Sequence, residues 1–173
     1  HTIGRRQRQM CIRDRISKDA FVGTWKLVEV KSVDNQQKVS YPYGQNPVGY
    51  TIYTQDGYIS CSIIMRNRLG LGLPIQEIFN MAYGGKAKIT NLFKYLRATV
   101  RYIQAGNKYA SYICKYEIRN NKLIYHIEVS LVPDFVGTDI EMAFEISEDT
   151  LVITRLYGEN KDNSIIASWQ RVS

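Results

Sequence analysis

Two long alternating segments joined by Asn120-Asn121 lie within residues 107–138. A two-residue Asn-Asn connection suits a tight turn with positive φ at both positions, which matches the twist of two antiparallel strands. The turn fixes a register in which large apolar side chains share one face, and a slip by one residue would mix the faces. Each strand is about ten residues long, as barrel walls tend to be. The predicted apolar pairs are Ile118–Leu123, Tyr116–Tyr125, Cys114–Ile127 and Tyr112–Val129.

Six further alternating segments, residues 23–30, 49–54, 58–64, 140–146, 151–157 and 164–172, bring the predicted strands to eight. Nearly all are sequential neighbours joined by short turns. A meander of this kind closes into a barrel because closure removes the exposed strand edges. The predicted fold is mainly β, an eight-stranded antiparallel up-and-down barrel with a helical insertion between strands three and four. Eight strands leave room inside for side chains or one small ligand.

The second and third strands flank Asp56-Gly57, a strong hairpin signal. With that pair as a two-residue turn, the two strands divide into one mainly apolar and one mainly polar face. The apolar face then holds Tyr50, Ile52, Thr54, Ile59, Cys61 and Ile63, and the polar face holds Thr51, Tyr53, Tyr58, Ser60 and Ser62.

The insertion reads as two helices. Pro74 suits the first turn of a short helix that ends at Gly84-Gly85. A second helix, residues 86–104, has apolar residues at helical spacing and Lys94, Arg97 and Arg101 on its far side. Such a helix could lie on an anionic membrane, but we favour packing on its own protein, over one mouth or flank of the barrel. Whether it acts as a lid is open.

Residues 1–16 do not fit the rest of the chain. They contain five Arg and one Asp, with no periodicity and no apolar core of a signal peptide. They resemble translated sequencing-adapter read-through more than a basic arm for nucleic acid or lipid. We therefore expect a non-native extension, followed by a single barrel domain over residues 17–173. The formal charge of +7 falls to +3 without them.

The cysteines and the lengths of the apolar segments indicate the cellular compartment in which the chain is expected. Cys61 and Cys114 fall mid-strand on apolar positions, where buried free thiols are the simplest interpretation. Without a secretion signal, a reducing cytoplasm is the expected compartment. No run of 18 apolar residues exists, so no stable membrane insertion is expected.

Five sequence blocks in order resemble the bacterial and fungal lipocalin-like domain family, over about residues 20–172. Gly23-x-Trp25 is similar to the first-strand signature of lipocalins and other calycins, and Trp169-Gln170-Arg171 is similar to their last strand. Cys114 departs from the glycine usual in the family. The blocks are Gly23-Thr24-Trp25, Val39-Ser40-Tyr41-Pro42-x-Gly44, Gly49-Tyr50-x-Ile52-Tyr53-Thr54-x-Asp56-Gly57-Tyr58-x-Ser60, Tyr109-x-x-Tyr112-x-x-x-Tyr116-Glu117 and His126-x-Glu128-x-Ser130-x-x-Pro133-x-x-x-Gly137-Thr138.

The resemblance implies a calycin-type barrel in which Arg171 packs across the Trp25 ring and ties the two chain ends together. It implies no settled activity, because a fold of this kind hosts many functions. Gly23, Trp25, Trp169 and Arg171 are therefore structural candidates.

The candidate catalytic residues are His126 and Glu128, with Ser130 following on the same strand side. A His–Glu pair could transfer a proton near neutral pH. Tyr53 and Ser60 on the earlier hairpin could complete a polar site. The alternative is that this face, which also carries Lys115 and other charges, is the wet exterior.

A second candidate site lies on the apolar face. The Glu148-Asp149 turn pairs Met142 with Arg155, which places Arg155 among apolar residues. It either sits at a rim in water, which we favour, or anchors an acidic ligand head. Tyr50, Tyr112, Tyr116 and Tyr125 would form cavity walls with hydroxyl groups.

The leading hypothesis is a barrel that holds a mostly apolar, acidic or aromatic small molecule. The alternative is a cofactor-free isomerase or cyclase using His126 and Glu128 as acid and base, so enzyme activity stays open. A barrel that interacts through its basic helix is a third hypothesis. No nucleic-acid partner, metal or cofactor is expected, since the chain lacks a Cys/His cluster and a phosphate-binding Gly loop. The oligomeric state is open.

Overall fold

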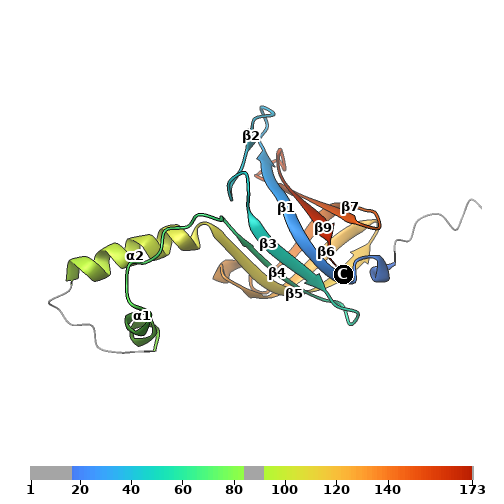
Figure 1. Cartoon of the computed structure of the whole chain (residues 1–173). Coiled ribbons are helices and arrows are strands. Elements are labelled where there is room, and N and C mark those ends of the chain that lie inside the picture. Colours follow the sequence, from blue (N-terminus) through green and yellow to red (C-terminus); the bar gives the residue numbers. More distant parts are fainter. Residues whose placement is uncertain (1–16, 84–91, 173) are drawn as a thin grey trace, which may run out of the picture.

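The computed structural model describes residues 17–83 and 92–172. These residues form a β-barrel and, beside it, two helices (Figure 1). The elements are a short 3-10 helix Lys18–Ala20, β1 Gly23–Val33, β2 Val39–Ser40, β3 Val48–Tyr53, β4 Tyr58–Ile64, α1 Ile75–Ala82, α2 Leu92–Gly106, β5 Tyr109–Arg119, β6 Lys122–Ser130, a second 3-10 helix Pro133–Phe135, β7 Asp139–Ile146, β8 Thr150–Tyr157 and β9 Asn163–Arg171. The expected non-native extension, residues 1–16, lies outside the described residues.

The barrel closes because β1 pairs with two strands. It is antiparallel to β3 on one side and to β9 on the other, while β3 to β9 follow one another in sequence order. The predicted eight-stranded antiparallel barrel is therefore confirmed, with β2 as a short additional strand beside the far end of β1. The helices lie between β4 and β5, where the insertion was expected.

One end of the barrel is filled by aromatic side chains. Phe21 is fully buried, and its ring centroid lies 5.4 Å from that of Tyr53 and 5.0 Å from that of Phe144. Beside this cluster, the guanidinium of Arg171 lies 4.0 Å from the Trp25 ring centroid, as the family resemblance implies. Burial of such large apolar side chains is the main source of stability. We call this the closed end.

The central hairpin forms largely as predicted. Asn120 and Asn121 have φ of 53° and 58°, as a tight turn requires. The register matches the prediction from Arg119–Lys122 to Cys114–Ile127, and then a bulge shifts it. Glu128 is the extra residue, so Tyr112 pairs with Ser130 and not with Val129. Beyond the bulge, the predicted pairing is wrong.

The predicted faces of β3 and β4 are wrong in half of their members. The connection is a three-residue loop, Gln55–Gly57, in which Gly57 has φ of 90°. Because the loop has an odd number of residues, Tyr53 pairs with Ile59 and Thr51 pairs with Cys61. The inner face therefore holds Thr51, Tyr53, Ile59, Cys61 and Ile63, and Tyr50 and Ile52 point outward.

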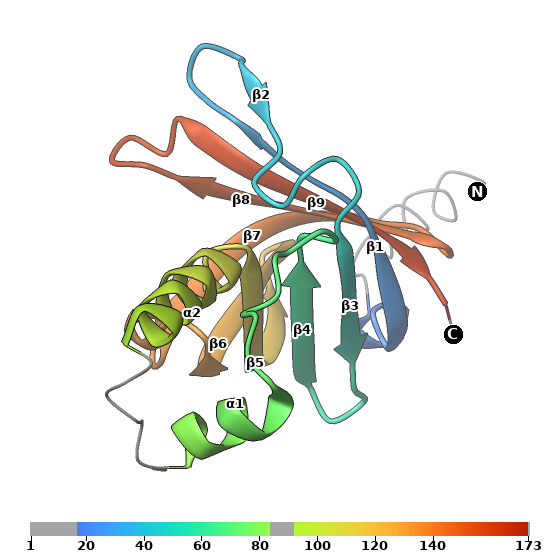
Figure 2. The same ribbon diagram turned by 60° about the vertical axis from the view of Figure 1, so that its left-hand side comes forward.

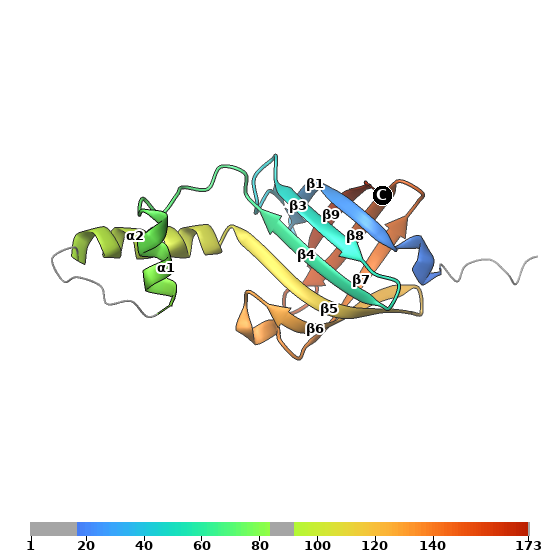
Figure 3. The same cartoon turned by 60° about the horizontal axis from the view of Figure 1, so that its bottom comes forward.

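The two helices form an arm that extends from the other end of the barrel (Figures 1 and 3). α1 begins at Ile75, directly after Pro74 as predicted, whereas the predicted start of the second helix at Lys86 lies outside the described residues. The expectation that the second helix packs over the barrel is wrong. Only Asn107 and Lys108 separate α2 from β5, and α2 continues outward from that strand (Figure 3); in Figure 2 the arm comes forward, in front of the barrel.

Candidate functional site

A cavity of about 570 Å³ occupies the open end of the barrel, on the side where the helical arm begins. Its wall alternates with the pleat, since every second residue of a strand points inward. Most of the lining side chains are aliphatic or aromatic, a composition typical of sites for small apolar ligands. The lining side chains include Tyr112, Tyr125, Ser130, Phe135, Met142, Ile153, Arg155, Ile165 and Trp169.

Arg155 is the charged side chain of the cavity wall. It follows Ile153 on the inner face of β8, and its guanidinium lies 5.5 Å from the Phe135 ring centroid. Within the described residues it makes no ion pair and no side-chain hydrogen bond. The residue is half-buried and lines the cavity near its mouth, so it lies at a rim as the favoured interpretation expected, and its role as a ligand anchor stays a prediction.

The deep part of the cavity also holds an unpaired polar atom. Trp169 is 3% exposed, and its indole Nε1 has no hydrogen-bond partner among the described residues. A buried donor without a partner costs free energy. Trp169 lies four positions after Ile165, the partner of Arg155, which corresponds to about 13 Å along β9. The cavity wall therefore contains a cation near the mouth and, deeper, a tryptophan whose N–H group is unpaired.

Three buried tyrosines lie in or behind the cavity wall, where Tyr112 and Tyr125 line the cavity and Tyr53 lies behind Tyr125. The hydroxyl groups of Tyr125 and Tyr53 are hydrogen-bonded to each other, and the ring centroids of Tyr112 and Tyr125 are 6.0 Å apart. Burial raises the pKa of all three phenols well above the usual value, so they stay neutral at physiological pH. They act as hydroxyl donors and acceptors in an otherwise apolar wall.

The predicted ligand-binding residues fall into three groups. Tyr112, Tyr125, Ser130 and Arg155 line the cavity, whereas Tyr53 and Tyr116 are buried deeper in the core. Tyr50 and Ser60 lie on the outer surface. The three-residue loop reverses the face of β3 that the sequence assigned to Tyr50, whereas Ser60 stays on the polar face of β4, which points outward. Ser130 reaches the cavity only because the bulge at Glu128 turns it inward beside Tyr112.

The predicted catalytic pair does not come together. His126 lies on the outer face of β6, where its Nδ1 is 2.6 Å from Asp139 Oδ1 and its Nε2 is 3.4 Å from Glu117 Oε1. Glu128 is exposed and lies 3.7 Å from Lys115 Nζ. Neither residue lines the cavity. The face that carries His126 and Glu128 is the outer, solvent-exposed face of the barrel, which was the alternative interpretation of the sequence.

Two contributors to the cavity were not assigned to ligand binding from the sequence. Trp169 was predicted only as a structural residue, although strand alternation places it on the same side as Ile165 and Ala167. Phe135 belongs to the loop between β6 and β7, where no periodicity predicts a side-chain direction. The inward direction of Trp169 could have been predicted by extending the inward–outward alternation of β9, whereas that of Phe135 could not.

The described residues offer little else for chemistry. No three His, Cys, Asp or Glu side chains among them gather as a metal site. Cys61 and Cys114 are buried free thiols, and burial raises the pKa of Cys61 to about 11, which suppresses the reactive thiolate. No described helix is long and apolar enough to cross a membrane.

Comparisons with known proteins bear on the fold. A family model described as lipocalin-like domain matches residues 22–172. Among solved structures, bovine odorant binding protein in complex with a selenium-containing odorant matches 92% of this chain and 75% of its own chain. The two are 7% identical and have a TM-score of 0.40. No curated protein matches the chain.

Proposed function

Because the chain belongs to the lipocalin-like domain family, we propose that its cavity binds a small, mostly apolar molecule with an acidic group, held by Arg155. The carboxylate of a fatty acid or an aromatic acid has the charge and the planar shape that a guanidinium binds through two hydrogen bonds. The apolar body would lie against the aliphatic and tyrosine wall.

The observation that carries this proposal is the unpaired charge of Arg155. A cation among apolar side chains is costly unless an anion compensates it. The described residues supply no such anion, and a ligand carboxylate in the cavity would. The Phe135 ring beside the guanidinium would cover the pair from water.

The free N–H group of Trp169 supports a second requirement on the ligand. A hydrogen-bond acceptor at the Trp169 end of the ligand would satisfy it. This favours an elongated molecule, such as a hydroxylated or oxo fatty acid, over a compact one. A volume of about 570 Å³ lies within the usual range for small-molecule sites.

The test is a displacement titration of a fluorescent fatty acid, cis-parinaric acid, by matched acids and alcohols of one chain length. The native chain should bind the acid more tightly than the alcohol. Arg155→Gln should weaken binding of the acid about tenfold to a hundredfold, because a charged hydrogen bond is lost, and should leave the alcohol almost unchanged. Arg119→Gln, on the outer surface, is the control.

Two results would contradict the proposal. If neither acid nor alcohol displaces the probe, the cavity does not hold apolar molecules. If Arg155→Gln weakens both ligands equally, or neither, the acidic group is wrong. No observation favours the isomerase alternative, since His126 and Glu128 lie outside the cavity with other partners.

A further inference from the structure

Positive charge is concentrated in the sequence between β4 and β5, residues 65–106, which contains the two helices of the arm. This stretch has one acidic residue, Glu77, whereas residues 17–64 and 107–173 together have 14 acidic and 11 basic residues. The formal charge is therefore +6 for this stretch and −3 for the barrel domain without it. The basic residues of this stretch that the structure describes are Arg66, Arg68, Lys94, Arg97 and Arg101.

One face of α2 is apolar and exposed. Five side chains at helical spacing form this apolar stripe, and they keep from 47% to 88% of their surface exposed. Ala98, on the opposite face of the helix, is buried. The stripe thus points away from the described part of the chain, and burying it would be favourable. Its members are Leu92, Phe93, Leu96, Val100 and Ile103.

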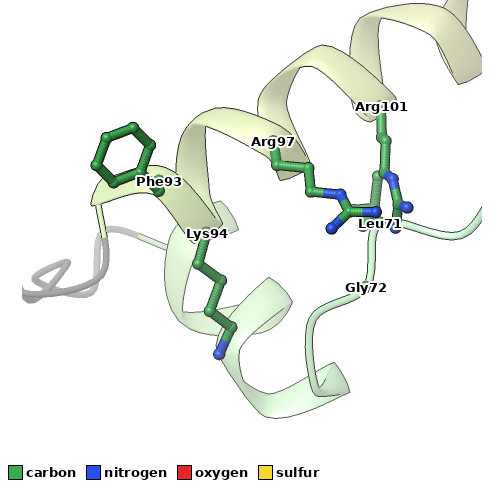
Figure 4. A pocket seen from close by; sticks show the side chains of 6 residues that line it. All are labelled: Leu71, Gly72, Phe93, Lys94, Arg97 and Arg101. Atoms are coloured by element: carbon green, nitrogen blue, oxygen red, sulfur yellow. The ribbon is translucent and has the colours of Figure 1, made fainter.

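Three basic residues of α2 form a basic flank, of which Arg97 borders the stripe while Lys94 and Arg101 lie further round the helix, on the side of α1 and Leu71-Gly72. Lys94, Arg97 and Arg101 line a depression of about 480 Å³ between α2 and Leu71-Gly72, and Phe93 forms its edge (Figure 4). Lys94 is paired with Glu77 at 2.8 Å, and Arg101 donates a hydrogen bond to the Gly70 carbonyl at 3.1 Å. Arg97 lies one helical turn from Phe93, and its side chain has no ion-pair or hydrogen-bond partner among the described residues.

We propose that α2 docks on the surface of a bilayer containing anionic phospholipids. The apolar stripe would enter the boundary between headgroups and acyl chains, and Arg97 at its border would meet the lipid phosphates. An exposed apolar face with basic residues beside it and on the polar side is typical of helices that lie in a membrane interface. Docking goes beyond ligand binding in the barrel, and it would bring the cavity mouth, which Gly106 and Asn107 at the end of α2 help to line, towards the lipid.

Charge argues against a second copy as the occupant. α2 has no acidic side chain, and the one acidic residue of the arm is already paired with Lys94. Two arms in contact would bring their basic residues together without compensation, and like charges repel. An anionic surface satisfies the apolar stripe and the basic flank at once.

The experiment is flotation of the full chain with phosphatidylcholine vesicles, with and without about 30% phosphatidylglycerol. The native chain should float with the anionic vesicles and remain mostly unbound with the neutral ones, and salt at about 0.5 M should weaken binding. Arg97→Glu and the double variant Leu96→Ser, Val100→Ser should each lower the partition coefficient about tenfold or more. Arg119→Glu and Val129→Ser, on the outer barrel wall, are the matched controls.

Each outcome decides the proposal. The substituted arm residues lie outside the core, so the variants should keep the native urea midpoint. Absence of flotation, equal flotation with neutral and anionic vesicles, or an effect of the controls equal to that of the arm variants would overturn it. A concentration-dependent dimer, seen by light scattering, would also overturn it if the double variant disrupted this dimer and the native chain did not bind vesicles.

Discussion

Arg171 connects three separate parts of the chain at the closed end. Its guanidinium donates hydrogen bonds to the carbonyl groups of Ala20 at 2.6 Å, Val22 at 2.8 Å and Glu148 at 2.6 Å. It also covers the Trp25 ring, whose Nε1 donates to the Phe21 carbonyl at 2.8 Å. One side chain thereby holds the segment before β1, the β7–β8 turn and the last strand in one place.

Replacing this residue should therefore cost much more than replacing a typical surface arginine. Arg171→Leu is expected to lower the free energy of unfolding by about 2–3 kcal/mol, since charged hydrogen bonds and a cation–π contact are lost. Arg119→Leu, an exposed side chain with one ion pair, should change it by about 0.5 kcal/mol or less. Urea unfolding followed by tryptophan fluorescence measures both, and equal midpoints for the two variants would contradict the role given to Arg171.

At the scale of single elements, the β5–β6 hairpin depends on its turn. Asn121 has φ of 58°, a conformation that costs an ordinary L-residue about 1–2 kcal/mol and asparagine less. Asn121→Ala should lower the free energy of unfolding by about 1 kcal/mol, whereas Asn121→Gly should stay within about 0.5 kcal/mol of the native chain. Asn160→Ala, in an exposed loop, is the control for loss of an asparagine. If Asn121→Ala and Asn121→Gly lower the urea midpoint equally, the positive φ at this position is not the cause of the lost stability.

Turns and bulges also explain how far the sequence predicts this fold. The two-residue turn at Asn120-Asn121 was predictable because few residues adopt its backbone, and so were the core pairs beside it. Asp56-Gly57 suits a two-residue or a three-residue loop, and choosing the wrong one placed Tyr50 inside and Tyr53 outside. The bulge at Glu128 leaves no local signal, although it turns Ser130 into the cavity.

The helices show the same limit. Apolar spacing predicts that α2 is amphipathic, but it does not say what covers the apolar face. The sequence favoured the barrel as that cover, and the structure instead leaves Leu92 and Phe93 exposed. The inward direction of Arg155 was predictable from the alternation of β8, because the β7–β8 register follows from a clear turn. The loop between β6 and β7 has no such alternation, so its contribution to the cavity was not predictable.

For the whole molecule, the two ends of the barrel have different tasks. The closed end is filled by Phe21, Trp25 and their neighbours and supplies stability, while the open end keeps a cavity and carries the helical arm. Between them lie Tyr53, Tyr112 and Tyr125, which burial keeps protonated. These phenols report on the integrity of the barrel, because they can ionise readily only when it opens.

Stability should consequently fall at alkaline pH. A phenol whose pKa is raised by burial keeps its proton in the folded chain while the unfolded chain releases it above its ordinary pKa of 10.0, so the free energy of unfolding decreases from there upward. Cys61, raised to about 11 from 9.0, adds to the loss from pH 9. Three phenols give a slope of up to about 4 kcal/mol per pH unit. Below pH 9 these groups are protonated in both states and should have no effect.

The variant Tyr112→Phe isolates this contribution from other groups that titrate in the same range. It removes one buried phenol, so urea unfolding above pH 10 should show a slope smaller than in the native chain by up to about 1.4 kcal/mol per pH unit, and by about half of that at pH 10. Tyr83→Phe, which removes an exposed phenol, should leave the slope unchanged. If Tyr112→Phe follows the native curve, or if all thirteen tyrosines ionise near pH 10 while the barrel stays folded, burial does not hold these protons.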